Sequence, residues 1–313
     1  MQVDEKKQIH KRNEEARGGT SASGRIERGA RAAQRAQREA AGGRMGCCQT
    51  KLAKGANGKV RLEAVDDESA ETEPVSPKKE LTPENLLLSA SLAGDASTVQ
   101  TLVSSGVKVN AKGEKDYTAL HNATRNGHTA LVEMLIAHNA DINAKTNAKN
   151  TPLHLAAIFG HDGAGQKLIA GGAELMARNN VGIMPLHAAS LGGHTGVGRL
   201  LLNSGAEIDA KDTYWTALHN ASRGGHAEFV ELLLEHNANA NVRGLEGNTP
   251  LHHAALEGHV KAVRALMQAD ADVNIMNDHK LTSLHMACMG GHHDCVKHLM
   301  ERASDDTMRQ FNM

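Results

Sequence analysis

Histidine is the residue type in this chain that most suggests chemistry, because an imidazole transfers protons near neutral pH and commonly binds metals. The sequence holds nineteen histidines. Many of them recur at two fixed places, one after Leu in a Thr-x-Leu-His motif, with Met in place of Thr before His187, and one after Gly. The first set is His121, His154, His187, His219, His252 and His285, and the second is His128, His161, His194, His226, His259 and His292. The first set is spaced by 33, 33, 32, 33 and 33 residues. Such spacing indicates a repeated structural role rather than one reactive site.

A second group of residues could hold a metal or carry an acyl group. The run His292-His293-Asp294-Cys295 contains the residues of the Asp-His-His-Cys signature of protein acyltransferases, but in another order and without a cysteine-rich setting. By register, Cys295 instead shares a column with buried apolar positions, where a free cysteine packs well: Leu131, Val197 and Phe229. The chain also has no glycine-rich phosphate loop, Gly-x-Ser-x-Gly elbow or His-Glu-x-x-His motif. We therefore expect no catalytic residue, no metal and no cofactor.

The most specific modification motif lies near the N-terminus. Met45-Gly46-Cys47-Cys48-Gln49-Thr50 fits the pattern for N-myristoylation, and Cys47 and Cys48 are candidates for palmitoylation. One myristoyl chain binds membranes only marginally, so a palmitate and the basic residues that follow would be needed for stable anchoring. Acylation of Gly46 requires translation to start at Met45. If translation starts at Met1, the match is accidental, and the sequence leaves both readings open.

The rest of residues 1–80 has little apolar content. The first 44 residues carry eleven Lys and Arg against six Asp and Glu, with no hydrophobic periodicity. This composition predicts a disordered basic leader followed by an acidic linker. Ser76 precedes Pro77 and is a candidate for phosphorylation by a proline-directed kinase. No aromatic residues interleave the basic ones, so we expect no nucleic-acid binding.

The bulk composition limits the class of protein. The net charge is -1 and aromatic residues make up only 2% of the chain, which favours thin, repeated layers of small helices over one closed core. The four cysteines show neither a disulfide framework nor zinc-ligand spacing. No apolar run approaches the roughly 20 residues needed to cross a membrane, and the N-terminus has no secretory signal. We therefore expect a cytoplasmic protein.

In each repeat we expect a first helix, a turn and a second helix, and these elements position the repeated histidines. Thr is a good N-cap and Pro suits the first helical position, so Thr-Pro-Leu-His predicts the start of a short helix. The Gly-His pair predicts a turn, and a second helix follows with Leu in one fixed column: Leu135, Leu168, Leu201, Leu233, Leu266 and Leu299. One such unit cannot bury its own apolar face, whereas stacked units bury a continuous core.

This pattern resembles the ankyrin repeat, a 33-residue unit with the motif T-P-L-H-x-A. The resemblance implies an all-α solenoid of helix-turn-helix units with short β-hairpin fingers. It divides the chain after the disordered region 1–80 into a degenerate capping repeat, six full repeats and a tail: 81–111, then 112–144, 145–177, 178–210, 211–242, 243–275 and 276–308, then 309–313. The fourth full repeat is one residue short, and the register places the missing residue in the hairpin before Trp215.

Glycines in two second helices are a further departure from the family pattern. Gly163 and Gly165 lie in one of these helices, and Gly196 and Gly198 lie in the next. Each interior glycine costs a helix about 1 kcal/mol relative to alanine. The sequence therefore predicts that the middle repeats are the least stable part of the stack and that Gly163→Ala and Gly198→Ala stabilise it.

The resemblance also implies that a partner protein binds a concave face made of the hairpin tips and the ends of the first helices. Trp, Tyr and Arg contribute most of the binding energy in protein interfaces. The candidate protein-binding residues on that register are Tyr117, Arg125, Phe159, Ile183, Tyr214, Trp215, Arg223 and Leu256. Aromatic and arginine side chains in such a line favour a protein or peptide ligand over a small-molecule substrate.

The sequence thus predicts a non-catalytic scaffold or adaptor. It would lie in the cytoplasm, at the cytoplasmic face of a membrane if Gly46 is acylated. Two alternatives use the same surface: a regulatory or inhibitory subunit that docks on an enzyme, and a substrate-recognition fragment of a larger enzyme.

Overall fold

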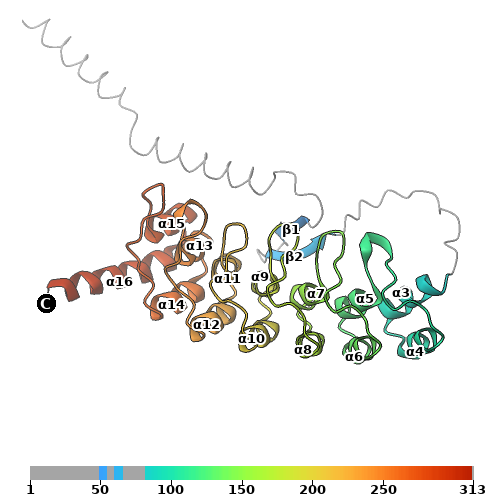
Figure 1. Ribbon diagram of the computed structural model, residues 1–313. Helices are drawn as coiled ribbons and strands as arrows, with labels where there is room; N and C mark the ends of the chain where they lie inside the picture. The colour runs from blue at the N-terminus through green and yellow to red at the C-terminus, as the bar shows by residue number, and fades with distance from the viewer. Residues whose placement is uncertain (1–48, 55–59, 66–81, 312–313) are drawn as a thin grey trace, which may run out of the picture. The chain divides into compact units, whose positions relative to one another are not determined.

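The computed structural model describes residues 49–54, 60–65 and 82–311 (Figure 1). The first two segments form a hairpin, in which β1 (Gln49–Lys54) pairs antiparallel with β2 (Val60–Val65). These strands differ from the disorder expected for residues 1–80. In β2, apolar and charged residues alternate with a period of two. A search for helical spacing does not detect so short an alternation.

Two rows of helices make up the rest of the described chain, and their order confirms the predicted all-α solenoid (Figure 1). The first helix of each unit contacts the first helices of its neighbours; these are α3 (Pro83–Ala93), α5 (Ala119–Arg125), α7 (Pro152–Phe159), α9 (Pro185–Gly192), α11 (Ala217–Gly224), α13 (Pro250–Leu256) and α15 (Ser283–Gly290). The second helices form the other row; these are α4 (Ala96–Ser104), α6 (Thr129–Ala137), α8 (Asp162–Ala170), α10 (Thr195–Asn203), α12 (Ala227–Glu235), α14 (Val260–Gln268) and α16 (His293–Phe311).

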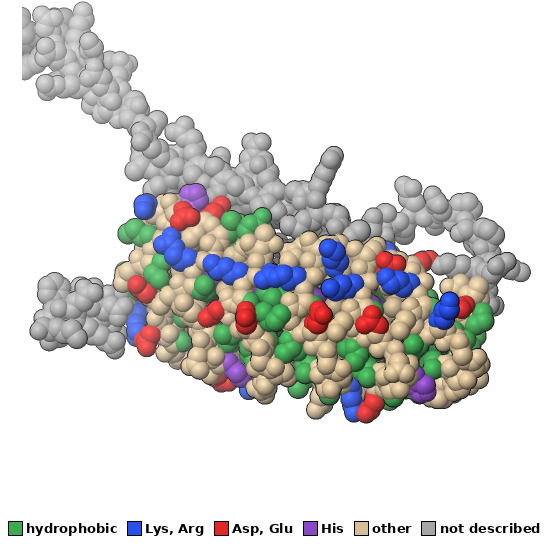
Figure 2. All heavy atoms as spheres, viewed as in Figure 1, with side chains coloured by type: hydrophobic (Ala, Val, Ile, Leu, Met, Phe, Trp, Pro, Cys, Tyr) green, Lys and Arg blue, Asp and Glu red, His purple; other side chains and the backbone are tan. Residues whose placement is uncertain are grey.

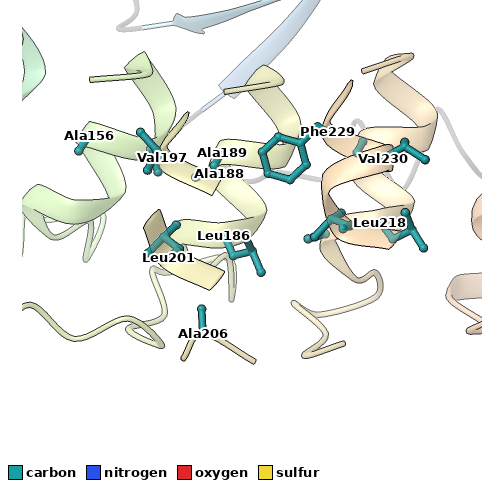
Figure 3. Packing of buried hydrophobic residues seen from close by; sticks show 14 of the residues in the cluster. Ala156, Leu186, Ala188, Ala189, Val197, Leu201, Ala206, Leu218, Phe229 and Val230 are labelled. Carbon is teal, nitrogen blue, oxygen red and sulfur yellow. The ribbon is translucent and has the colours of Figure 1, made fainter. Parts of the chain in front are cut away.

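The core runs between these rows, and Figure 3 shows part of it. The predicted Leu column is buried in all six repeats, with exposed fractions of 0–1%. Cys295 is also fully buried, in the column where the sequence places it, and burial raises the pKa of its thiol. A buried, neutral thiol is a poor nucleophile. Cys295 is therefore a packing residue.

Five of the six motif histidines link their repeat to the next through a hydrogen bond that we call a joint, whereas His285 in the last repeat bonds only Thr282 of its own repeat. In His154, Nδ1 accepts a hydrogen bond from the Thr151 amide at 3.1 Å, so the proton lies on Nε2. Nε2 then donates to the Ile183 carbonyl of the next repeat at 3.0 Å. The same two bonds recur at three more repeats, in His121, His219 and His252. Burial lowers the pKa of His121, His154 and His219 to about 4, so these rings are neutral at physiological pH.

His187 is the exception among these rings. Its Nε2 donates to the Trp215 carbonyl of the next repeat at 3.1 Å, as the Nε2 atoms of the other joint histidines do. Its Nδ1, however, is buried without a hydrogen-bond partner, because Met184 stands where the other repeats have the N-cap threonine. Met at position 184 therefore removes the hydrogen bonds between the N-cap residue and Nδ1, and the bond from Nε2 to the next repeat remains.

The Gly-His pairs make a second set of joints in the opposite direction. His161 Nε2 donates to the Arg125 carbonyl of the preceding repeat at 2.9 Å, and its ring lies against Gly127. Gly127 has a φ of 73°, and a side chain there would overlap the ring. Equivalent Nε2–carbonyl bonds of 3.0–3.1 Å recur at His128, His194, His226, His259 and His292. The repeated histidines are thus structural, as their spacing predicts.

The hairpin tips explain the short repeat. In the full-length tips an amide bonds the carbonyl four residues later, as from Thr146 to Asn150 at 3.1 Å. In the short repeat the bond runs from the Asp212 amide to the Trp215 carbonyl, three residues later, at 2.8 Å. The Asp212 carboxylate also accepts the amides of Tyr214 and Trp215. The missing residue therefore lies in this tip, where the sequence register places it.

The glycines in the second helices require a correction. A Cβ at Gly198 would lie 2.6 Å from the buried Phe229 ring, and one at Gly163 would lie 2.7 Å from Thr129 Oγ1. One at Gly196 would overlap the Asp162 carboxylate. Only Gly165 has room, with its nearest neighbours at 3.8 Å. The expectation that alanine stabilises the stack is therefore wrong at Gly198, where a fully buried ring occupies the space and packing outweighs helix propensity. At Gly163 and Gly196 the new methyl group meets the end of a side chain that can rotate.

Candidate protein-binding surface

Two arginine–aromatic pairs lie on the stack, with the two arginines in the same column and the two rings at different places, since Trp215 lies in a hairpin tip and Phe159 ends a first helix. The Arg223 guanidinium lies 5.0 Å from the centre of the Trp215 ring, and Arg125 lies 5.7 Å from that of Phe159. Each arginine comes from the C-terminal part of a first helix, α11 or α5. All four side chains are partly exposed. The structure therefore brings half of the predicted binding residues together as two pairs.

The other predicted residues are less uniform. Tyr214 is 46% exposed at the short hairpin tip beside Trp215. Tyr117 is partly exposed, and its ring lies 5.6 Å from His121. Ile183 and Leu256 are partly buried and pack against the core, and their carbonyls accept the joint histidines His154 and His292. The side chains of Ile183 and Leu256 therefore mainly pack against the core, and only a part of each is exposed to a partner.

Trp215 also contacts a residue that the sequence interpretation missed. Its ring meets His253 edge-on at 5.2 Å, and His253 in turn lies 5.8 Å from His219. His253 is 5% exposed. The same column holds Leu155, Ala188 and Met286 in three repeats and Asn122 and Asn220 in two others. The sequence signal is therefore weak, because polar residues occur in this column elsewhere, and the ring contacts are what set His253 apart.

A row of cations is the second feature that the sequence interpretation missed. One exposed Lys or Arg opens each of five successive repeats: Lys112, Lys145, Arg178, Lys211 and Arg243. Several of them link repeats, since Arg178 donates to the Lys211 carbonyl and Lys211 to the Arg243 carbonyl, both at 2.8 Å. Figure 2 shows a line of basic side chains along the stack with acidic ones next to it. On this face of the described part of the chain, basic and acidic side chains therefore lie next to each other, and no large area carries charge of a single sign.

The remaining predictions concern metal ions, membranes and covalent modification. Among residues 49–54, 60–65 and 82–311, no group of three or more His, Cys, Asp or Glu could hold a metal ion. Within the same ranges, no helix is both long enough and apolar enough to cross a membrane. The predicted lipidation residues Gly46, Cys47 and Cys48 lie outside the described residues, as does the predicted phosphorylation site Ser76.

Comparisons with known proteins agree with this architecture. The family model for ankyrin repeats in three copies matches residues 86–179, 164–244, 186–277 and 237–310, and the chain therefore belongs to the ankyrin-repeat family. Proteins of this family generally act as protein–protein interaction modules. The search of curated protein sequences found no match.

Solved structures show the same fold. The chain is similar to the ankyrin repeat domain of human ASB11, with 27% identity and a TM-score of 0.62 over 69% of this chain and 96% of that one. It is also similar to the ankyrin repeat domain of Bcl-3, described as a unique member of the IkappaB protein family. That match has 28% identity and a TM-score of 0.61 over 69% of this chain and 97% of the other.

Proposed function

We propose that this protein is a non-catalytic adaptor that binds a partner protein through the hairpin tips and the C-terminal ends of the first helices. The observation that carries the proposal is the two partly exposed arginine–aromatic pairs, Arg125 with Phe159 and Arg223 with Trp215. Such side chains supply much of the binding energy in protein interfaces. Tyr214 and Tyr117 extend the surface at the tips, and Ile183 and Leu256 add partly buried apolar side chains to it.

Substitutions on this surface should separate binding from folding. Trp215→Ala or Arg223→Glu should weaken partner binding by about 30-fold or more, because a central interface residue contributes on the order of 2 kcal/mol. Arg199→Glu, a charge reversal at an exposed position of α10, is the matched control and should bind normally. A photo-crosslinking residue in place of Tyr214 should label the partner, whereas one in place of the exposed Glu228 should not. Equal labelling from both positions, or equal binding by all variants, contradicts the proposal.

The alternatives use the same surface and differ in what the partner does. A regulatory or inhibitory subunit would change the catalytic rate of an enzyme that it binds. A substrate-recognition fragment would belong to a longer chain with a catalytic domain. Mass spectrometry of the native polypeptide and activity assays on the captured partner distinguish these from an adaptor.

We further propose that the protein acts in the cytoplasm and is attached to the cytoplasmic face of a membrane by acylation of Gly46 and of Cys47 or Cys48. The support is the sequence motif and the basic residues after it. Gly46→Ala should release the protein from the membrane fraction completely. Cys47→Ser with Cys48→Ser should leave weak attachment, because a single myristoyl chain binds only marginally.

The start codon provides the control for this prediction. Met45→Ala should abolish attachment if translation begins at Met45, and N-terminal mass spectrometry of the native protein identifies the start directly. A protein that begins at Met1, carries no lipid and fractionates away from membranes contradicts the tethering proposal and leaves the partner-binding surface untouched.

A further inference from the structure

We infer that the face of α11 and α13 around Trp215 is a binding site for a carboxylate group, supplied by an acidic side chain of the partner. The inference rests on the proposed partner-binding function and names the chemistry of its centre. Four residues form the site, which we call the donor cluster: Trp215, Asn220, Arg223 and His253.

The donor cluster is layered from the surface inward. Arg223 and Trp215 are partly exposed, and the guanidinium lies 5.0 Å from the indole ring. His253 lies below, edge-on to the indole at 5.2 Å, and His219 lies 5.8 Å from His253. Asn220 and Arg223 are three residues apart on α11 and therefore share one side of the helix. A group that reaches Arg223 from outside thus arrives at the entrance to the cluster.

Three polar atoms of the cluster are buried without a hydrogen-bond partner: Trp215 Nε1, Asn220 Nδ2 and His253 Nε2. Each such atom destabilises the free protein, since a buried donor without an acceptor keeps its full desolvation cost. The contrast with Asn122, in the same column as Asn220, shows that the column can satisfy this amide. Asn122 Nδ2 donates to the Leu88 carbonyl at 3.0 Å. The donor cluster is therefore a local exception within the repeat pattern.

Arg223 is the cation of the cluster that would attract an anion. Burial, and after it the interactions with His219 and Arg223, hold the pKa of His253 well below its usual range, so its ring is neutral and adds no charge. Asp212 is the acidic residue that precedes Trp215 in the tip, and its carboxylate already accepts two backbone amides. Within the described part of the chain, no carboxylate forms a salt bridge with Arg223.

A carboxylate fits this arrangement because the indole Nε1 and the amide Nδ2 can only donate hydrogen bonds, and a guanidinium has no acceptor atom. Arginine and a carboxylate form bidentate, charge-assisted hydrogen bonds. A carboxylate held by Arg223 would accept from the indole and, as the indole turns away from His253, from the Asn220 amide and from His253 in its Nε2–H tautomer. Binding would thus give the indole and the amide the acceptors that they lack in the free protein, which makes the cluster specific for an acid over its amide.

The chain contains a single tryptophan, so the indole N–H resonance and the tryptophan fluorescence report on the donor cluster alone. The full-length protein is titrated with sodium acetate, and with acetamide, at ionic strength held constant by sodium chloride. We expect a saturable shift of the indole resonance with acetate and none with acetamide. Arg223→Gln should weaken the acetate response at least tenfold. His253→Leu introduces the residue that another repeat has at the same place, Leu155. This substitution should weaken the acetate response severalfold.

Arg125→Gln is the matched control, because it removes the equivalent arginine from Phe159 and should leave the acetate response unchanged. The inference is overturned by a response that does not saturate, by an equal response to acetamide, or by an equal loss in Arg125→Gln. A stronger response to inorganic phosphate at the same ionic strength overturns the carboxylate assignment. Partner binding that depends on Trp215 in a protein with no acetate response would contradict this inference alone and leave the proposed function standing.

Discussion

Between pH 6.5 and pH 5 the free energy of unfolding of the repeat stack should fall by several kcal/mol. His121, His154 and His219 are neutral in the folded chain, with a pKa of about 4 that burial lowers from 6.5. The unfolded chain takes up these protons near pH 6.5 and the folded chain does not. The stabilisation is therefore complete above pH 6.5 and is lost as the pH falls toward 4, by about 1.4 kcal/mol per pH unit for each histidine.

Urea unfolding followed by circular dichroism at pH 8, 7, 6 and 5 measures this dependence, and the slope of the unfolding free energy against pH counts the protons taken up. His154→Gln removes one of these groups and should reduce the slope by about one proton between pH 6 and 5. A free energy that stays level from pH 7 to pH 5 would show that the joint histidines are protonated in the folded chain.

Alanine at two glycines of the same region should have opposite effects. At Gly165 the nearest atoms to a new Cβ are 3.8 Å away, so Gly165→Ala should stabilise the stack by up to about 1 kcal/mol through helix propensity. At Gly198 the Cβ would lie 2.6 Å from the fully buried Phe229 ring. Overpacking of a core costs about 1–3 kcal/mol, which outweighs the gain in propensity. Gly198→Ala should therefore destabilise the stack.

A double-mutant cycle tests the stated cause. If the Phe229 ring opposes the new methyl group, Gly198→Ala should be harmless or stabilising in a Phe229→Leu background, with a coupling energy of about 1 kcal/mol or more. Thermal or urea unfolding of the four proteins gives this number. Additive effects of the two substitutions would mean that the contact with Phe229 does not decide the outcome.

Most of the fold follows from the sequence because its signals are periodic. The Leu column, the N-cap threonines and the Gly-His turns each recur at a fixed interval, so one unit interpreted correctly predicts the others. The same reasoning failed at Gly198, where propensity within one helix was considered without the Phe229 ring of the next repeat. The hairpin of β1 and β2 was missed because its signal is a short alternation outside the repeats.

The candidate surface was only partly predictable. Trp215, Arg223 and Tyr214 stood out because aromatic and arginine residues at the tips are conspicuous in a chain so poor in aromatics. His253 and Asn220 did not stand out, since their column holds both apolar and polar residues in the other repeats. Their importance depends on which atoms find a hydrogen-bond partner across repeats, and residue spacing alone contains no information about that.

The short tip at Trp215 shows how the two histidine joints bear on the evolution of recognition. One residue is missing there, yet His187 still reaches the Trp215 carbonyl at 3.1 Å and His226 still reaches the Leu191 carbonyl at 3.0 Å. The spacing between neighbouring repeats is fixed by these joints and not by the length of the tip. Insertions, deletions and substitutions at a tip can therefore change the partner that is recognised without altering the pitch of the stack, so that specificity and architecture can diverge independently.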